Sequence, residues 1–155
     1  ENDEIATTSI FGNFMAGSYF FANQAYNANE LTINDQLYLL ESQIIHSLAE
    51  KGPCVIIGRC ADYVLREHKH TLNVFVHADI EFRKKRAVEH YGISPKKIEE
   101  FLHKQDKHRA HYHSFYTDQK WKAIENYDLT IDSSRFGVDA SVEMIIAAAK
   151  IKSGI

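Results

Sequence analysis

The hydrophobic residues of this chain first repeat with a helical period and later gather into short apolar runs. After residue 34 they stand at offsets of i, i+3, i+7, i+8 and i+11, at Leu37, Leu40, Ile44, Ile45 and Leu48. This spacing predicts a helix with one apolar face. Gly52 and Pro53 follow it, and because proline cannot continue a helix, the pattern places the helix end there.

The rest of the pattern alternates between strands and helices. Residues 54–58 form a continuous apolar run that ends in glycine, which is typical of a strand buried on both faces. Asp79 and Gly92 are suited to begin and end a helix, and Ser94 with Pro95 predicts the start of another. The further predicted elements are a short helix over 61–67, strands over 71–78 and 128–133, helices over 79–90 and from 94 to about 115, and a final helix over 138–150.

Helices that alternate with buried strands predict an α/β fold, a three-layer α/β/α arrangement around a mostly parallel sheet. Ligands of such folds bind beyond the carboxyl ends of the strands. Gly58, Arg59 and Asp62 follow one predicted strand end and therefore form a candidate site. The alternative is purely structural, with Arg59 solvated and Asp62 capping the short helix that follows.

A second group of charges lies on two predicted helices. Arg83 and Arg86 are three residues apart on one of them, and Asp106 and Arg109 have the same spacing on the other. Basic side chains gathered in this way suit a small polyanionic ligand. The structural alternative is a solvated face with an Asp106–Arg109 ion pair, which stabilises the fold only slightly.

Composition narrows the classes of protein that fit. The 155 residues carry a net charge of −3, with 45% hydrophobic and 25% charged residues, as in a globular domain. A net negative chain argues against duplex nucleic acid or an anionic membrane as the main partner. Two cysteines fit a reducing, cytoplasmic location better than a disulfide framework. Four histidines crowd residues 103–113 without the spacing of a helical zinc site, so we expect no metal site there.

Four segments together resemble a known family. They are "GPCVIIGRCADYVL", "VFVHADIEFRKKRAVEHYGIS", "KQDKHRAHYHSFY" and "NYDLTIDSSRFGVDASVEMI", in this order over roughly residues 34–150. They resemble the cytidylate kinase-like branch of the P-loop nucleoside monophosphate kinases. The resemblance implies a P-loop nucleoside triphosphate hydrolase-like fold and phosphoryl transfer from ATP, accompanied by Mg²⁺, to a cytidine-type nucleoside monophosphate.

The same resemblance implies roles for the charged residues. Gly58, Arg59 and Asp62 would contact the nucleoside monophosphate, and Asp106 and Arg109 would bind the acceptor nucleotide and its phosphate. The catalytic arginines, which neutralise the transferring phosphates, would be Arg83, Arg86 and Arg109. We also expect these acceptor residues to face one cleft. Within a single domain of 155 residues, the resemblance implies an acceptor-region insertion over 1–31, core elements over 34–92, a lid-like segment over 94–120, and the last strand and helix over 127–150.

The chain departs from this family at its amino-terminal end. "FGNFMAGSYF" has two glycines but lacks the Gly-x-x-x-x-Gly-Lys-Ser/Thr phosphate loop, and no apolar strand precedes it. Either the phosphate-loop unit lies outside this chain or the protein is a non-catalytic nucleotide-binding or regulatory module. We expect the 155 residues alone to be an inefficient kinase.

The missing unit includes the central strand of the sheet, between the predicted strands 54–58 and 71–78. An empty slot there would leave backbone groups unpaired. We therefore expect it to be filled by a separate amino-terminal segment, by a strand from a partner subunit in a homo-oligomer, or by direct pairing of the two flanking strands.

Overall fold

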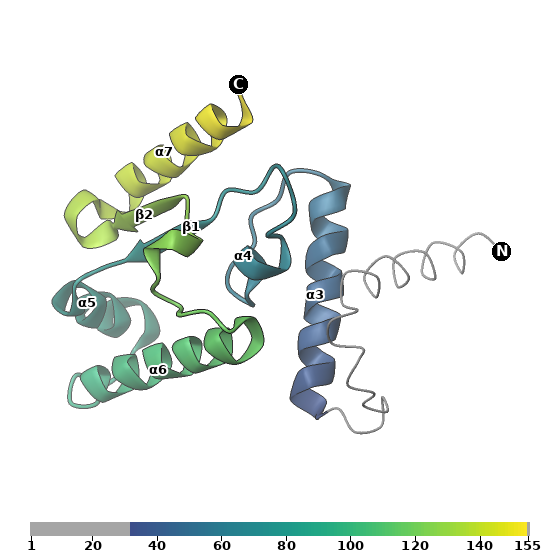
Figure 1. The fold of residues 1–155 in the computed structure, drawn as a ribbon. Helices are drawn as coiled ribbons and strands as arrows, with labels where there is room; N and C mark the ends of the chain where they lie inside the picture. The colour runs from purple at the N-terminus through teal and green to yellow at the C-terminus, as the bar shows by residue number, and fades with distance from the viewer. Residues whose placement is uncertain (1–31, 155) are drawn as a thin grey trace. The chain divides into compact units, whose positions relative to one another are not determined.

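A computed structural model describes residues 32–154 (Figure 1). The chain divides into two compact units, Glu1–Glu41 and Ser42–Ile155, with the boundary inside helix α3. The second unit contains the sheet and the remaining helices. The predicted insertion over residues 1–31 lies outside the described residues, and the single-domain organisation stays a prediction.

Helix α3 covers Ile33–Lys51, which confirms the helix expected from the hydrophobic period. Thr32 and Asp35 cap its first turn reciprocally: the Asp35 amide donates to the Thr32 hydroxyl at 3.2 Å, and the Thr32 amide donates to the Asp35 carboxylate at 3.2 Å. The helix stops before Gly52, whose φ of 142° is open to few other residues.

Two short parallel strands form the sheet. Strand β1 (Val74–His77) pairs with β2 (Leu129–Asp132) in parallel, with Val74 opposite Leu129 and His77 opposite Asp132. Both predicted strands are therefore present, although each is shorter than predicted. Ile131 of β2 is 2% exposed, and the ring of Phe75 on β1 packs against Trp121 and Tyr127 at centroid distances of 5.5 and 5.0 Å.

The prediction of a buried strand over residues 54–58 is wrong for the described structure. These residues form no strand, and Val55 and Ile57 are 92% and 89% exposed. An apolar run is buried as a strand only when neighbouring strands and helices cover it, because its backbone needs a ladder partner. Within residues 32–154 the sheet consists of β1 and β2 alone, so this segment has no strand to pair with.

The two-stranded sheet tests one expectation for the central slot, the direct pairing of residues 54–58 with β1. No ladder joins residues 54–58 to β1 among the described residues, so the two flanking segments have not closed on each other. Direct pairing, one of the three expected outcomes, is therefore not observed. Filling by an amino-terminal segment or by a partner subunit stays a prediction.

Helices α5 (Ile80–Tyr91) and α6 (Ile98–Thr117) form a packed pair below the sheet in Figure 1. The Asp79 carboxylate accepts a hydrogen bond from the Phe82 amide at 2.7 Å, and Gly92 ends α5 in the left-handed conformation, both as predicted. The two helices meet at a small apolar core of Ala87, Ile98 and Leu102, to which Ile80 and Ile93 add their side chains.

The predicted start of α6, with Ser94 as N-cap and Pro95 as first helical residue, is wrong by three residues. Ile93 and Ile98 both pack at the core around Ala87, so the chain has to turn between them. The Lys97 amide accordingly donates to the Ser94 carbonyl at 3.0 Å in a turn, and the helix begins at Ile98.

Helix α7 (Ser133–Ser153) packs on both strands and follows β2 without a loop. The Asp132 carboxylate caps its first turn by accepting from the Ser134 amide at 3.0 Å, and this turn was not predicted. Gly137, with a non-helical φ of 77°, separates that turn from the helical segment predicted to start at Val138. Short helices α4 (Ala61–Val64) and η1 (Ile124–Asn126) complete the described elements.

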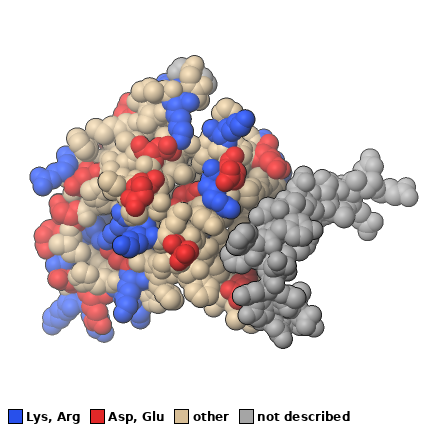
Figure 2. Space-filling view, viewed as in Figure 1, with Lys and Arg blue, Asp and Glu red and all other residues tan. Residues whose placement is uncertain are grey.

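Residues 42–154 thus form a mixed α/β unit with a small parallel sheet, whose two strands lie between α7 and the α5–α6 pair in Figure 1. No helix in the described range combines the length and the apolar character needed to cross a membrane. On the face shown in Figure 2, acidic and basic side chains of the described residues are interspersed.

Candidate active site

One face of α6 changes from apolar to polar along the helix. Ile98 and Leu102 are buried at its beginning, and Asp106, His113 and Thr117 continue the same stripe at helical spacing. His113 and Thr117 are 4% and 5% exposed. Polar groups on the packed face of a helix need partners, because burying them unpaired costs free energy. The partners of these residues define the candidate site.

Three cations surround the carboxylate of Asp106. Arg83 of α5 donates to it through both terminal nitrogens, at 2.8 and 2.7 Å, and Arg109 donates through one nitrogen at 3.3 Å. The Lys122 ammonium lies 3.9 Å away. Burial would raise the pKa of Asp106, but the hydrogen bonds from Arg83 and the nearby positive charges hold it below its usual value. The cluster therefore keeps a positive excess at neutral pH, which is a local feature in a chain of net charge −3.

The three predicted catalytic arginines differ in what they can offer a ligand. The Arg83 side chain is 26% exposed and forms the two-pronged bridge to Asp106. The Arg109 side chain is 55% exposed and contacts Asp106 through a single long hydrogen bond. Arg86 lies over the Phe82 ring at 6.0 Å. Arg109 is thus more exposed than Arg83 and less tightly held by Asp106, which both nitrogens of Arg83 bind.

A strained turn carries the other predicted site residues. Gly58, Arg59 and Cys60 have φ values of 71°, 57° and 54°, three left-handed residues in succession. For residues other than glycine this conformation costs about 1 kcal/mol or more each, so neighbouring structure has to hold it. Cys60 is buried, and the guanidinium of exposed Arg59 lies 5.9 Å from the ring centre of Tyr112 on α6.

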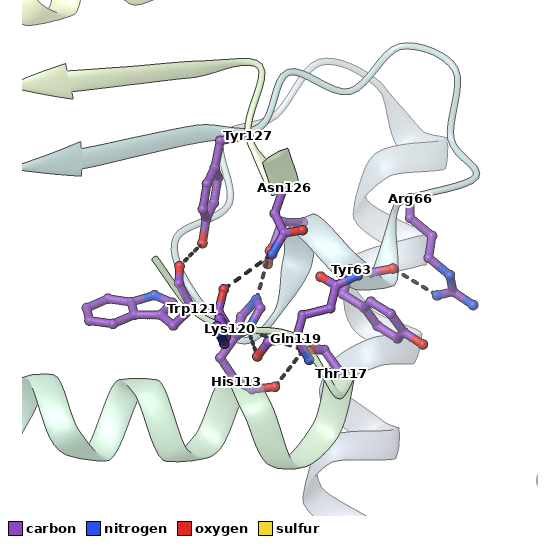
Figure 3. Close-up of polar contacts among 10 residues, drawn as sticks. Tyr63, Arg66, His113, Thr117, Gln119, Lys120, Trp121, Asn126 and Tyr127 are labelled. Atoms are coloured by element: carbon purple, nitrogen blue, oxygen red, sulfur yellow. Dashed lines mark hydrogen bonds and ion pairs between the residues drawn. The ribbon is translucent and has the colours of Figure 1, made fainter. Parts of the chain in front are cut away.

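Asp62 follows this turn and joins it to α6. Its carboxylate lies 2.9 Å from Nε2 of His113, and the side chains of the two residues are 18% and 5% exposed. Nδ1 of His113 lies 3.2 Å from the Thr117 hydroxyl and 3.5 Å from the Gln119 carbonyl (Figure 3). No side chain caps α4, so the structural alternative of Asp62 as a helix cap is not what the structure shows.

The cytidylate kinase-like family model matches residues 2–135. The chain belongs to the cytidylate kinase-like family. One similar solved structure is an uncharacterized protein from Eubacterium ventriosum, with a TM-score of 0.71 and 30% sequence identity over 76% of this chain and 74% of that one. No curated protein matches the sequence.

Family membership confirms the resemblance read from the sequence motifs, and the structure groups the motif residues in two places. Arg59 and Asp62 lie at the left-handed turn, while Asp106 and Arg109 lie with Arg83 on the α5–α6 pair. Tyr112 and His113 on α6 contact the first group, so one helix touches both.

A cavity of about 200 Å³ borders Asp62. It is lined by Asp62, Tyr63, Arg66, Asn73, Gln119, Glu125 and Asn126. Arg59, Asp106 and Arg109 are not among these lining residues, so the expectation that all four acceptor residues face one cleft stays a prediction.

Three contributors were not predicted from the sequence: Lys122, Tyr112 and His113. In the sequence His113 is one of four histidines that lack the spacing of a helical zinc site. The available signal was its position seven residues after Asp106 and four after Arg109, which puts it on the same helical face. In the described range no group of three or more histidine, cysteine or acidic side chains could hold a metal ion.

Tyr127 lies close enough to Asp62 to feel its charge. Its hydroxyl donates to the Trp121 carbonyl at 2.6 Å (Figure 3), and burial together with the negative charges of Asp62 and Cys60 raises its pKa to about 12. A raised pKa means that the folded state holds the proton more tightly than the unfolded chain, whose tyrosine pKa is about 10.

We expect the stability contributed by this difference to be present below about pH 10 and lost as the pH rises toward about 12. Tyr127→Phe removes the titrating group, so urea unfolding midpoints should fall less steeply across this window than in the parent protein. Tyr91→Phe, at a residue that is 75% exposed, is the matched control. Equal slopes for both variants would contradict the assignment.

Proposed function

We propose that the protein is a nucleoside monophosphate kinase-like phosphotransferase that transfers the terminal phosphoryl group of ATP to a cytidine-type nucleoside monophosphate. The observation that carries the proposal is the cluster of Arg83, Arg109 and Lys122 around the single carboxylate of Asp106. In a member of the cytidylate kinase-like family, such an excess of positive charge is suited to the phosphate of an acceptor nucleotide.

The chemistry explains why these residue types suffice. Phosphoryl transfer depends on placing the reacting groups in line and on stabilising charge on the phosphate oxygens, with little covalent help from the protein. The guanidinium of Arg109 would bind the acceptor phosphate, and Arg83 would hold Asp106 in the orientation that aims Arg109. Arg59, exposed at the strained turn, would supply a second planar fork for the nucleotide.

The sequence has no Gly-x-x-x-x-Gly-Lys-Ser/Thr phosphate loop, so we propose that the donor site needs more than the described residues. When bound, Mg²⁺ would neutralise charge on the phosphates of ATP and hold them through oxygen atoms and water. As part of the same proposal, the complete protein would have the three-layer P-loop fold and would be located in the cytoplasm.

A non-catalytic nucleotide-binding module is the second candidate. The absence of Gly-x-x-x-x-Gly-Lys-Ser/Thr from the 155 residues favours it, because without that loop the sequence has no recognisable site for the ATP phosphates. Both candidates share the acceptor site and differ in whether phosphoryl transfer follows binding.

A single experiment separates the two. The full-length protein is incubated with ATP, Mg²⁺ and each of CMP, dCMP, UMP, AMP and GMP, and nucleoside diphosphate formation is followed beside binding by calorimetry. Formation of CDP in preference to the other products supports the kinase, and binding of CMP without product supports the module. A protein that neither binds nor phosphorylates any of the five contradicts both.

A further inference from the structure

We propose that His113 is a positioning residue that holds the left-handed turn of residues 58–60 in place through Asp62, and thereby aims Arg59 at the acceptor phosphate. The inference rests on the proposed function at one point, the binding of the acceptor by Arg59. Nothing in the sequence motifs assigns this role to His113, and the residue lies 51 positions from its partner in the chain.

The first argument is that the turn needs an external restraint. Arg59 and Cys60 are both left-handed, and the short helix α4 that follows has no side-chain cap to hold its first turn. The 2.9 Å contact between Asp62 and His113 joins this segment to α6, a helix of 20 residues. A short, strained segment joined to a long helix takes its position from that helix.

The second argument is the burial and anchoring of His113 itself. Its side chain is 5% exposed, and both ring nitrogens have partners, with Asp62 on one side and Thr117 and Gln119 on the other. The Thr117 hydroxyl also donates to the His113 carbonyl at 2.7 Å. The ring therefore has one defined orientation, so it can hold Asp62 in one place.

The third argument is that consecutive residues of α6 contact both ends of the same segment. Tyr112 presents its ring to the guanidinium of Arg59, and His113 binds the carboxylate of Asp62. Since Asp106 and Arg109 lie one to two turns earlier on the same helix, the position of α6 sets both the turn and the cationic cluster. A displacement of α6 would therefore move the two parts of the acceptor site together.

The first test needs no nucleotide. In a Cys54→Ser background Cys60 is the remaining cysteine, and because it is buried its alkylation by iodoacetamide reports opening of the turn. His113→Ala should raise the alkylation rate about tenfold or more, because a charged, buried hydrogen bond is lost. His113→Gln, which keeps a donor near the position of Nε2, should restore most of the protection.

Two controls separate turn opening from general loss of stability. His108→Ala removes an exposed histidine from the same helix, and Ile131→Val loosens the core at β2 while keeping both side chains of the Asp62–His113 contact. Neither should raise the Cys60 rate as far as His113→Ala does. The proposal is overturned if Ile131→Val raises the Cys60 alkylation rate as much as His113→Ala does at the same loss of stability. It is also overturned if His113→Ala leaves that rate unchanged.

The second test measures whether His113 acts through Arg59. The loss of CMP affinity caused by His113→Ala is measured twice in the full-length protein: once in the parent protein and once in a protein that already carries Arg59→Ala. We expect about a tenfold loss in the parent and almost none in the second background, because the aimed group is already gone. Equal losses in both backgrounds would refute positioning while leaving the proposed function intact. Absence of CMP binding by the parent protein would instead refute the proposed function, and with it the aiming of Arg59.

Discussion

Replacing Arg83 by methionine is expected to lower the free energy of unfolding by about 1.5–3 kcal/mol, the range for hydrogen bonds to charged groups. Arg83 supplies both short hydrogen bonds to Asp106, whose side chain is only 19% exposed. Without it, the carboxylate keeps one hydrogen bond at 3.3 Å and a lysine at 3.9 Å. Methionine preserves much of the packing of the arginine stem, so the change reports mainly the lost bridge.

The stability lost on replacing Arg83 should become smaller as the pH falls. The pKa of Asp106 is lowered in the folded state, so the stabilisation by Arg83 is present above the carboxyl's ordinary value of 3.8 and is lost as the pH falls through the folded value. Urea unfolding at pH 7 and at pH 2–3 checks this. The difference between the two proteins should shrink toward zero in acid.

Lys85→Met is the control for this variant, because Lys85 lies on the same helix, is 74% exposed and pairs with Glu89 only at 3.9 Å. We expect it to change stability little, as exposed ion pairs do. A loss for Arg83→Met no larger than that of Lys85→Met, or one that persists in acid, would show that the bridge to Asp106 contributes no net stability.

Replacing Arg109 by alanine is expected to weaken CMP binding about 10- to 100-fold while leaving the fold nearly as stable as before. Charge-assisted hydrogen bonds to phosphate contribute about 1.5–3 kcal/mol, which corresponds to this range. The fold loses little, because the side chain is 55% exposed and contributes a single hydrogen bond of 3.3 Å. Isothermal calorimetry with CMP and urea unfolding measure the two quantities.

Lys107→Ala separates a specific contact from a change in net charge. Lys107 is an exposed neighbour on α6, so its loss removes the same charge from the chain. Arg109→Lys keeps the charge but not the planar fork, and we expect it to bind with intermediate affinity. If Lys107→Ala and Arg109→Ala weaken CMP binding equally, then binding depends only on the net charge of the protein. Arg109 would in that case not be part of the proposed site.

Local sequence was sufficient at both ends of α5, which nearby residues set. Asp79 caps α5 through an amide three residues away, and Gly92 ends the same helix through its own conformation. The hydrophobic period of α3 likewise needs only the spacing of its residues. These features lie within a few residues of one another, so the sequence pattern contains the information directly.

Strands β1 and β2 were predicted although each needs a distant partner, but two other predictions that depend on packing were wrong. The apolar run over residues 54–58 has the composition of a buried strand, but a strand also needs a neighbour, and the described residues provide none. The beginning of α6 was misplaced for a related reason. The packing of Ile93 and Ile98 around Ala87 outweighed the capping signal of Ser94 and Pro95.

The motifs also identified the family and the residue types of the candidate site, because glycine, arginine and aspartate occur there in a recognisable order. Spacing paired Asp106 with Arg109, three residues away, and that contact exists at 3.3 Å. The shorter contacts are those of Asp106 with Arg83 and of Asp62 with His113, across 23 and 51 residues. Helical spacing predicts neighbours only within one helix, whereas these pairs form because α5, α6 and the turn before α4 pack together, which tertiary structure alone decides.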